Sequence, residues 1–240
     1  MKIVVLAGGL SPERNVSLST GTMVTEALRA LGHRAGLIDL YFGLETGGAD
    51  EAFFDAPVSE AYKKISREAP DLDQVRRGRK GDSPSMFGPG VLELCRMADM
   101  VFLALHGTCG EDGRVQAAFD LMGIPYTGAG YLGSAIAMDK DLTKRMVADV
   151  VSTPGWKTVT YTAADIDRLV ETARLPLVVK PVASGSSIGV SIAYTAEELR
   201  RSLTEGLALG GRTVLEEYIR GREIQVGILE DKALPSIEII

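Results

Sequence analysis

The first forty residues carry two kinds of apolar pattern. Short apolar stretches at 2–7 and 33–40 predict two buried strands. Between them, apolar residues recur every three or four positions from Val16 to Leu31, which predicts a helix that ends at Gly32. A strand–loop–helix–strand unit is typical of a parallel α/β sheet, which binds ligands beyond the carboxyl ends of its strands. We therefore expect a ligand site in the loop that follows the first strand.

Glu13 is the candidate residue of that loop, because it lies close to the expected start of the helix. A carboxylate at this place either binds a ligand or only complements the positive end of the helix dipole. The pattern alone leaves both interpretations open.

A third apolar strand, at 100–105, ends in the glycine-rich loop 106–116, and a helix then runs to about Met122. His106 opens this loop, and Glu111 and Asp112 follow it. We interpret His106 as a site candidate, with a purely structural histidine as the alternative. Cys109 has no general base spaced to activate it, so we do not expect a nucleophile there.

Residues 41–90 are the least regular part of the chain. A helix is expected within 51–67. The basic stretch 76–82 is interpreted as a solvated surface loop rather than a nucleic-acid or targeting element, because acidic residues flank it.

The rest of the chain alternates between helical and strand patterns. Helices are expected at 91–97, 134–147, 163–173 and 196–209, and strands at 156–161, 177–179, 190–192, 214–219, 223–229 and 234–240.

The loop between the strands at 177–179 and 190–192 has the composition of a phosphate-binding flap. Glycines at 185 and 189 let backbone N–H groups approach a polyanion, and Ser186 and Ser187 add hydroxyl donors. Lys180 adds a positive charge. We expect this hairpin loop to close over the phosphates of a nucleotide; an ordinary Gly/Ser turn with a surface lysine is the alternative.

Composition narrows the class of protein. With 240 residues and 45% hydrophobic content, the chain can form one large or two compact domains. A net charge of −6 argues against general nucleic-acid binding. No apolar run reaches roughly 18 residues, so we expect no membrane span, and the N-terminal MKIVVLAGG is interpreted as a strand rather than a signal peptide. Two cysteines suit a reducing cytoplasm.

The stretch 128–133 matches G-x-G-x-x-G, the spacing of a dinucleotide-binding turn. Such a turn needs a full strand before it and an acidic residue after the βαβ unit. Only the short segment 124–127 precedes it, so we do not expect dinucleotide binding.

Five motifs together resemble the D-alanine–D-alanine ligase family of ATP-grasp enzymes. The most specific is HGTCGEDGRVQA at 106–117, followed by GGLSPERNVSLSTG at 8–21. The others are Met-Asp-Lys at 138–140, the lysine and small-residue loop at 180–189, and EEYIRGRE at 216–223. They occur in the family's order and with its spacing along essentially the whole chain.

The resemblance implies an α/β fold. It comprises an N-terminal, doubly wound parallel-sheet domain at 1–128, a central ATP-grasp domain at 129–215 and the start of a C-terminal ATP-grasp domain at 216–240. The family's sequence continues for roughly another hundred residues, so we expect an incomplete last domain. Ser184 stands where many members carry an acidic residue.

The resemblance also implies a reaction and its residues. ATP phosphorylates one D-alanine, and a second D-alanine attacks the acylphosphate, in cell-wall precursor synthesis in the bacterial cytoplasm. The residues implied to bind substrate are Glu13, Val16, His106 and Ser186. Of these, Glu13 and Ser186 are implied to be catalytic. The residues implied to bind ATP are Lys140, Lys180, Ser186, Ser187, Glu216, Glu217, Ile219 and Glu223.

Two Mg²⁺ ions, or Mn²⁺, are implied, with ligands that cannot be mapped onto these 240 residues. We therefore expect this chain alone to be inactive. A homodimer is implied, with no nucleic-acid or membrane partner. A D-alanine–D-serine or D-alanine–D-lactate ligase and an inactive nucleotide-binding fragment are the alternatives.

Overall fold

A computed structural model of the chain describes residues 1–44, 48–63, 69–185 and 187–240. The chain forms two compact units. Unit 1 comprises Met1–Met146 and Ala183–Ile188, and unit 2 comprises Val147–Val182 and Gly189–Ile240. Each unit has its own sheet and is described by itself.

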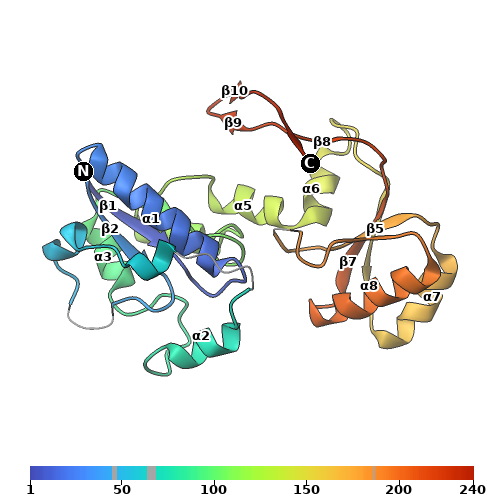
Figure 1. Cartoon of the computed structure of the whole chain (residues 1–240), viewed down its shortest axis with the longest axis horizontal. Coiled ribbons are helices and arrows are strands. Elements are labelled where there is room, and N and C mark those ends of the chain that lie inside the picture. The colour runs from blue at the N-terminus through green and yellow to red at the C-terminus, as the bar shows by residue number, and fades with distance from the viewer. Residues whose placement is uncertain (45–47, 64–68, 186) are drawn as a thin grey trace. The chain divides into compact units, whose positions relative to one another are not determined.

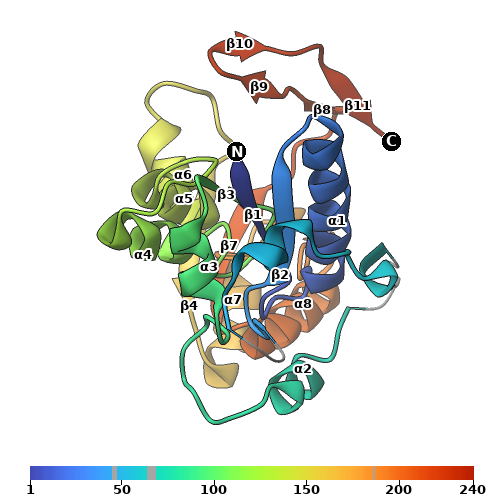
Figure 2. The same ribbon diagram turned by 90° about the vertical axis from the view of Figure 1, so that its left-hand side faces the viewer.

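The sheet of unit 1 is parallel, as the sequence predicts. Its strands are β1 (Lys2–Ala7), β2 (Arg34–Asp39) and β3 (Met100–Leu103), in the order β2-β1-β3. Helix α1 (Arg14–Ala30) connects β1 to β2 and packs against both (Figures 1 and 2). The central strand is therefore β1, and its carboxyl end delivers the chain to the loop that carries Glu13.

Both faces of this sheet are covered by apolar side chains. Ile3, Val5 and Ala7 of β1 pack with Leu18 of α1 on one face. The alternate residues of β1 pack on the other face against a cluster that includes Val91 and Phe119. Because strand side chains alternate between faces, burial on both sides explains why β1 is apolar throughout.

The remaining helices of unit 1 are short. They are η1 (Glu51–Asp55), η2 (Glu60–Lys63), α2 (Leu72–Gly78), α3 (Val91–Met97), α4 (Arg114–Met122), α5 (Tyr131–Met138) and α6 (Lys140–Val147).

Three sequence predictions in unit 1 were wrong. The helix expected within 51–67 is replaced, in its described part, by the 3₁₀ turns η1 and η2, and 64–68 lie outside the described residues. The basic stretch 76–82 is a loop only from residue 79, because α2 extends to Gly78 after Asp71 caps its start. The single helix expected at 134–147 is two helices, α5 and α6.

The break between α5 and α6 has a local cause. Asp139 adopts an extended conformation, with φ −89° and ψ 105°, and forms an isolated β-bridge with Ala183. Its carboxylate accepts a hydrogen bond of 2.9 Å from the N–H of Leu142. An aspartate that accepts from N–H groups at a helix start stabilises that start, so Asp139 begins α6 anew. Lys140 is consequently the first residue of α6.

The main sheet of unit 2 is antiparallel and four-stranded, in the order β4-β7-β5-β6. Its strands are β4 (Trp156–Thr160), β5 (Leu177–Pro181), β6 (Ser191–Ala193) and β7 (Arg212–Glu217). The pairing of β5 with β6 confirms the hairpin predicted around the small-residue loop.

Two helices cover one face of that sheet. Helix α7 (Ile166–Thr172), which follows the 3₁₀ turn η3 (Ala163–Asp165), lies beside α8 (Ala196–Ala208) in Figure 1. Leu199 and Leu203 of α8 are fully buried against Val179 and Leu215 of the sheet. Thr195 and Glu198 form a capping box that fixes the start of α8.

The last residues of unit 2 form an exposed arm. It contains β8 (Glu223–Gln225), β9 (Ile228–Leu229), β10 (Lys232–Ala233) and β11 (Ile237–Ile239), with β8 paired to β11 and β9 to β10. The strand predicted at 223–229 is therefore interrupted, since β8 and β9 have different partners. Among all the residues described, no helix is both long and apolar enough to cross a bilayer.

Candidate functional site

Glu13 lies at the N-terminal boundary of α1, directly after the loop that leaves β1. Its backbone is fixed, because its N–H donates to Ser11 Oγ at 3.1 Å and its carbonyl accepts from the N–H of Ser17 at 3.0 Å. Its side chain makes no capping hydrogen bond to α1. The Glu13 side chain therefore does not cap α1 by a hydrogen bond, and ligand binding remains one of the two interpretations.

Two glycines bring separate loops of unit 1 against the Glu13 carboxylate. A Cβ placed on Gly107 would lie 2.7 Å from Oε2 of Glu13, and one on Gly185 would lie 3.0 Å from the same oxygen. Gly107 also has φ +70°, which a side chain disfavours. The loops after β1, β3 and β5 thus meet at one carboxylate, and any larger residue at position 107 would displace it.

A buried ion pair ties the loop after β1 to the end of β2. The Arg14 guanidinium contacts the Asp39 carboxylate and donates to the carbonyl of Gly9 at 2.7 Å. The two residues are only 6% and 3% exposed. Asp39 also accepts from the N–H groups of Tyr41 and Phe42, at 2.8 and 3.1 Å. Arg14 adjoins Glu13 in the chain, so this pair fixes the backbone from which Glu13 projects.

The loop after β3 is held by its own acidic side chains. Glu111 accepts from the N–H of Gly107 at 2.6 Å, and Asp112 accepts from the N–H of Cys109 at 3.0 Å. His106 Nε2 lies 3.5 Å from Thr20 Oγ1 of α1. The two carboxylates therefore shape the loop, while His106 faces α1, the helix that begins beside Glu13.

Cys109 is buried, and burial together with the neighbouring Asp112 raises the pKa of its thiol. A raised pKa leaves the thiol protonated near neutral pH, where it is a poor nucleophile. This agrees with the expectation from the sequence that Cys109 is not catalytic.

The loop between β5 and β6 also carries a lysine contact. Lys140 Nζ donates to the carbonyl of Ser184 at 2.6 Å, within unit 1. Ser184 Oγ donates to the carbonyl of Ile188 at 3.2 Å, and Ser187 is exposed with φ +56°. Ser186, predicted to act on both substrate and nucleotide, lies outside the described residues.

In unit 2, Lys180 and Glu216 form an ion pair across two neighbouring strands. Lys180 Nζ lies 2.7 Å from Glu216 Oε1, and the side chains are 25% and 9% exposed. The register pairs Val178 with Glu216 and Lys180 with Val214, so both charged residues are on the face opposite α7 and α8. A lysine ammonium is a compact point charge that binds phosphate, and Glu216 holds that of Lys180 over this face of the sheet.

The other predicted nucleotide residues follow along the same strand. Glu217 directs its side chain to the face opposite that of Glu216, and its N–H donates to the carbonyl of Gly155 at 2.9 Å. Its carbonyl is therefore the backbone group to consider for a base. Ile219 and Glu223 are exposed.

Sequence reasoning missed Arg14, Asp39 and Thr20. A signal for the first two exists in retrospect, because an arginine at a helix start and an aspartate at the end of the adjacent parallel strand meet at the same sheet edge. Nothing in the local pattern around Thr20 identifies it.

Mg²⁺ is bound by oxygen ligands, which in proteins include the carboxylates of Asp and Glu. Among the described residues, no group of three His, Cys, Asp or Glu side chains is arranged to hold an ion. These residues therefore do not by themselves fit a Mg²⁺ site.

The fold and the site define an α/β protein of the ATP-grasp class. The family model described as "D-ala D-ala ligase N-terminus" matches residues 2–129, and that described as "D-ala D-ala ligase C-terminus" matches residues 149–240. The chain belongs to the D-alanine–D-alanine ligase family.

Individual relatives agree with this assignment. The chain is 40% identical to the D-alanine–D-alanine ligase of Lacticaseibacillus casei and 41% to that of Pediococcus pentosaceus, with all of this chain covered and 67% and 69% of the relatives. It also resembles the crystal structure of the Bacillus anthracis ligase complexed with ATP, with TM-score 0.68 and 29% identity, over 100% of this chain and 66% of that one. The chain thus spans about two thirds of these relatives.

We predict that Asp39→Ala destabilises the protein by about 3–5 kcal/mol, because the buried Arg14 guanidinium loses its counter-charge. Urea unfolding followed by circular dichroism measures this. The double variant Arg14→Met/Asp39→Leu should recover most of the loss, since no charge is then left buried. The control is Asp55→Ala, which removes the exposed partner of Arg34; a loss no larger than in this control would contradict the role given to Asp39.

Proposed function

We propose that the protein joins two D-alanine molecules to D-alanyl-D-alanine with the cleavage of ATP to ADP and inorganic phosphate, supplying cell-wall precursor in the bacterial cytoplasm. The observation that carries the proposal is the convergence of three loops on the Glu13 carboxylate, with Gly107 and Gly185 against its oxygens. Because the chain belongs to the D-alanine–D-alanine ligase family, we interpret this carboxylate as the group that binds a D-alanine.

The reaction proceeds in two steps. The carboxylate of the first D-alanine attacks the γ-phosphorus of ATP, which breaks the bond to ADP and forms an acylphosphate. The amine of the second D-alanine, after losing a proton, attacks the acyl carbon; inorganic phosphate leaves the tetrahedral intermediate and the peptide bond forms. Both steps depend mainly on positioning and on neutralising phosphate charge.

In this proposal Glu13 binds the ammonium group of the first D-alanine. A carboxylate beside an ammonium forms a charge-assisted hydrogen bond, which is strong where water is excluded. Val16, one helical turn further along α1, and His106 line the same substrate. Ser186 is assigned to holding the substrate and ordering Glu13.

The nucleotide is assigned to the lysines and to β7. Lys140 and Lys180 contact the phosphates, and Ser187 closes over them with the loop backbone. Glu216 and the backbone at Glu217 and Ile219 bind the adenine base. Glu223 binds the ribose.

The Lys180–Glu216 ion pair supports this assignment, because Glu216 holds Lys180 on one face of the sheet before any phosphate arrives. The Lys140 contact with Ser184 supports it as well, since it ties the phosphate loop to the start of α6. We assign no step to Mg²⁺ or Mn²⁺, which the family resemblance implies, because no three candidate ligands come together among the described residues.

We also propose that the first two domains end at residues 128 and 215 and that the protein forms a homodimer. The acceptor is taken as D-alanine; D-serine and D-lactate are tested beside it as competing acceptors in every assay.

We predict that Glu13→Gln raises the KM for D-alanine by about 30–100-fold, since a hydrogen bond to a charged group contributes roughly 2–3 kcal/mol. Nucleotide affinity should stay within about twofold. Coupled ADP-release kinetics and calorimetry with ATP measure the two quantities. Glu26→Gln, on the same helix, is the matched control. Equal loss of D-alanine and nucleotide affinity would show that Glu13 does not bind the amino acid.

We predict that Lys180→Ala weakens ATP binding by about 10–100-fold, because a charged donor to the phosphates is removed. The control is Lys157→Ala, since Lys157 is in the same sheet but on its opposite face. Calorimetry on both variants decides the matter. Unchanged ATP affinity in Lys180→Ala would contradict the phosphate-binding assignment.

A further inference from the structure

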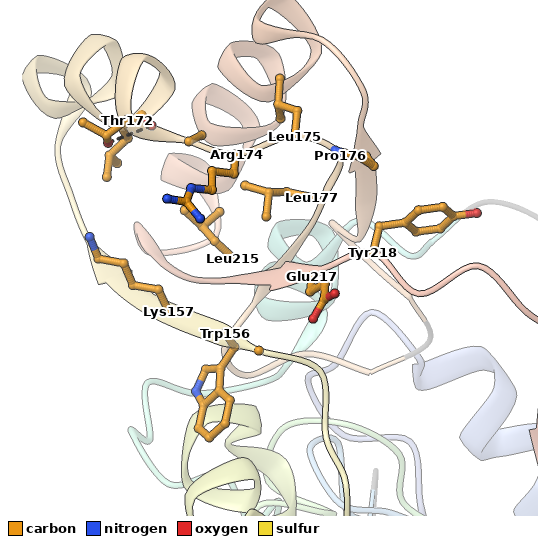
Figure 3. Close-up of a pocket in the computed structure, with 13 residues that line it drawn as sticks. Trp156, Lys157, Thr172, Arg174, Leu175, Pro176, Leu177, Leu215, Glu217 and Tyr218 are labelled. Carbon is orange, nitrogen blue, oxygen red and sulfur yellow. Dashed lines mark hydrogen bonds between the residues drawn. The ribbon is translucent and has the colours of Figure 1, made fainter.

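A cavity of about 830 Å³ lies in unit 2, between the segment that follows α7 and the ends of β4, β5 and β7 (Figure 3). The end of α7 and residues 173–176 form one wall, and the strands form the other. All of its lining residues belong to unit 2. The volume is within the range of small-molecule sites, roughly 300–1,000 Å³.

Strand register separates this cavity from the proposed nucleotide face. Lys157 is paired with Leu215, and Leu177 with Glu217, so these four residues share the face that α7 and α8 cover. Lys180 and Glu216 lie on the other face. Figure 3 shows Trp156 directed away from Leu215 and Arg174, in keeping with its pairing to Glu216. The cavity is thus a second site, which adjoins the proposed nucleotide site at Glu217.

The cavity combines an apolar floor with positive charge. Leu169, Leu175, Leu177 and Leu215 supply the apolar surface. Arg174 and Lys157 supply two cations against the single carboxylate of Glu217. Within the described part of the chain, neither of these cations forms a hydrogen bond or ion pair through its side chain, so both remain available to a ligand.

We propose that this cavity binds a small amphiphilic anion, an organic molecule with one carboxylate or sulfonate group and an apolar body. Arg174 lies two residues beyond the end of α7 and lines the cavity together with Leu215 and Leu177 (Figure 3). A guanidinium is weakly hydrated and presents paired donors that match a carboxylate. The anion therefore meets Arg174, with Lys157 adding charge, while the apolar body covers the leucines.

Because the two sites are on opposite faces of the sheet, the anion and the nucleotide can bind at the same time. A ligand that competes with ATP would occupy the Lys180 face, and one that does not is free to occupy the cavity. Simultaneous binding of the anion and ATP therefore distinguishes two separate sites from one shared site. This criterion does not depend on whether the proposed ligase activity is correct.

The test uses anilinonaphthalene sulfonate, a fluorescent amphiphilic anion, titrated into the whole protein with and without saturating ATP. We expect saturable binding that octanoate displaces and ATP leaves unchanged. Arg174→Glu should weaken it by at least about tenfold, as expected for a lost charge-assisted contact. Arg201→Glu is the matched control, because Arg201 is an exposed arginine of α8 outside the cavity.

Lys157→Glu provides a second variant should Arg174→Glu fail to fold, as judged by circular dichroism, and it should also weaken binding. Three results would overturn the proposal. They are probe affinity equal in the cavity variants and in Arg201→Glu, displacement of the probe by ATP, and no displacement by octanoate. The first places the probe elsewhere, such as on the exposed arm; the second places it in the nucleotide site.

Discussion

The buried contact between Arg14 and Asp39 is the constraint on which the site depends. Two charges that are nearly inaccessible to water are tolerated only when each is fully satisfied. Arg14 meets Asp39 and the carbonyl of Gly9, and Asp39 meets backbone N–H groups that follow β2. The loop after β1 is thereby locked to the end of β2, and Glu13 emerges from a fixed backbone.

Two glycines also shape the site around Glu13. At Gly107 and Gly185 the absence of a side chain lets two further loops approach the carboxylate of Glu13. In unit 2, side chains alternate between the two faces of the sheet. This alternation places Lys180 and Glu216 on one face and Leu215 and Glu217 on the other. The sheet thus has the proposed nucleotide-binding face on one side and a hydrophobic core, with a cavity beside it, on the other.

Much of this arrangement could be predicted from the sequence. Apolar periodicity located β1, α1 and the hairpin of β5 and β6 closely, because burial determines those patterns. It failed at Asp139, where a bridge to a residue 44 positions away in the chain, Ala183, interrupts a helical pattern. It also failed within the described residues 51–63, which contain the 3₁₀ turns η1 and η2. The miss at Asp139 comes from a contact that local sequence does not encode, as does the pairing of Arg14 with Asp39.

The central claim is that a D-alanine carboxylate is phosphorylated by ATP before the peptide bond forms. It is tested most directly with the full-length protein, ATP and D-alanine labelled with ¹⁸O in its carboxylate, followed by mass analysis of the inorganic phosphate released. An acylphosphate transfers one carboxylate oxygen to phosphorus, so the account predicts one ¹⁸O atom in each phosphate formed with product. Phosphate without the label, released in step with dipeptide, would contradict it.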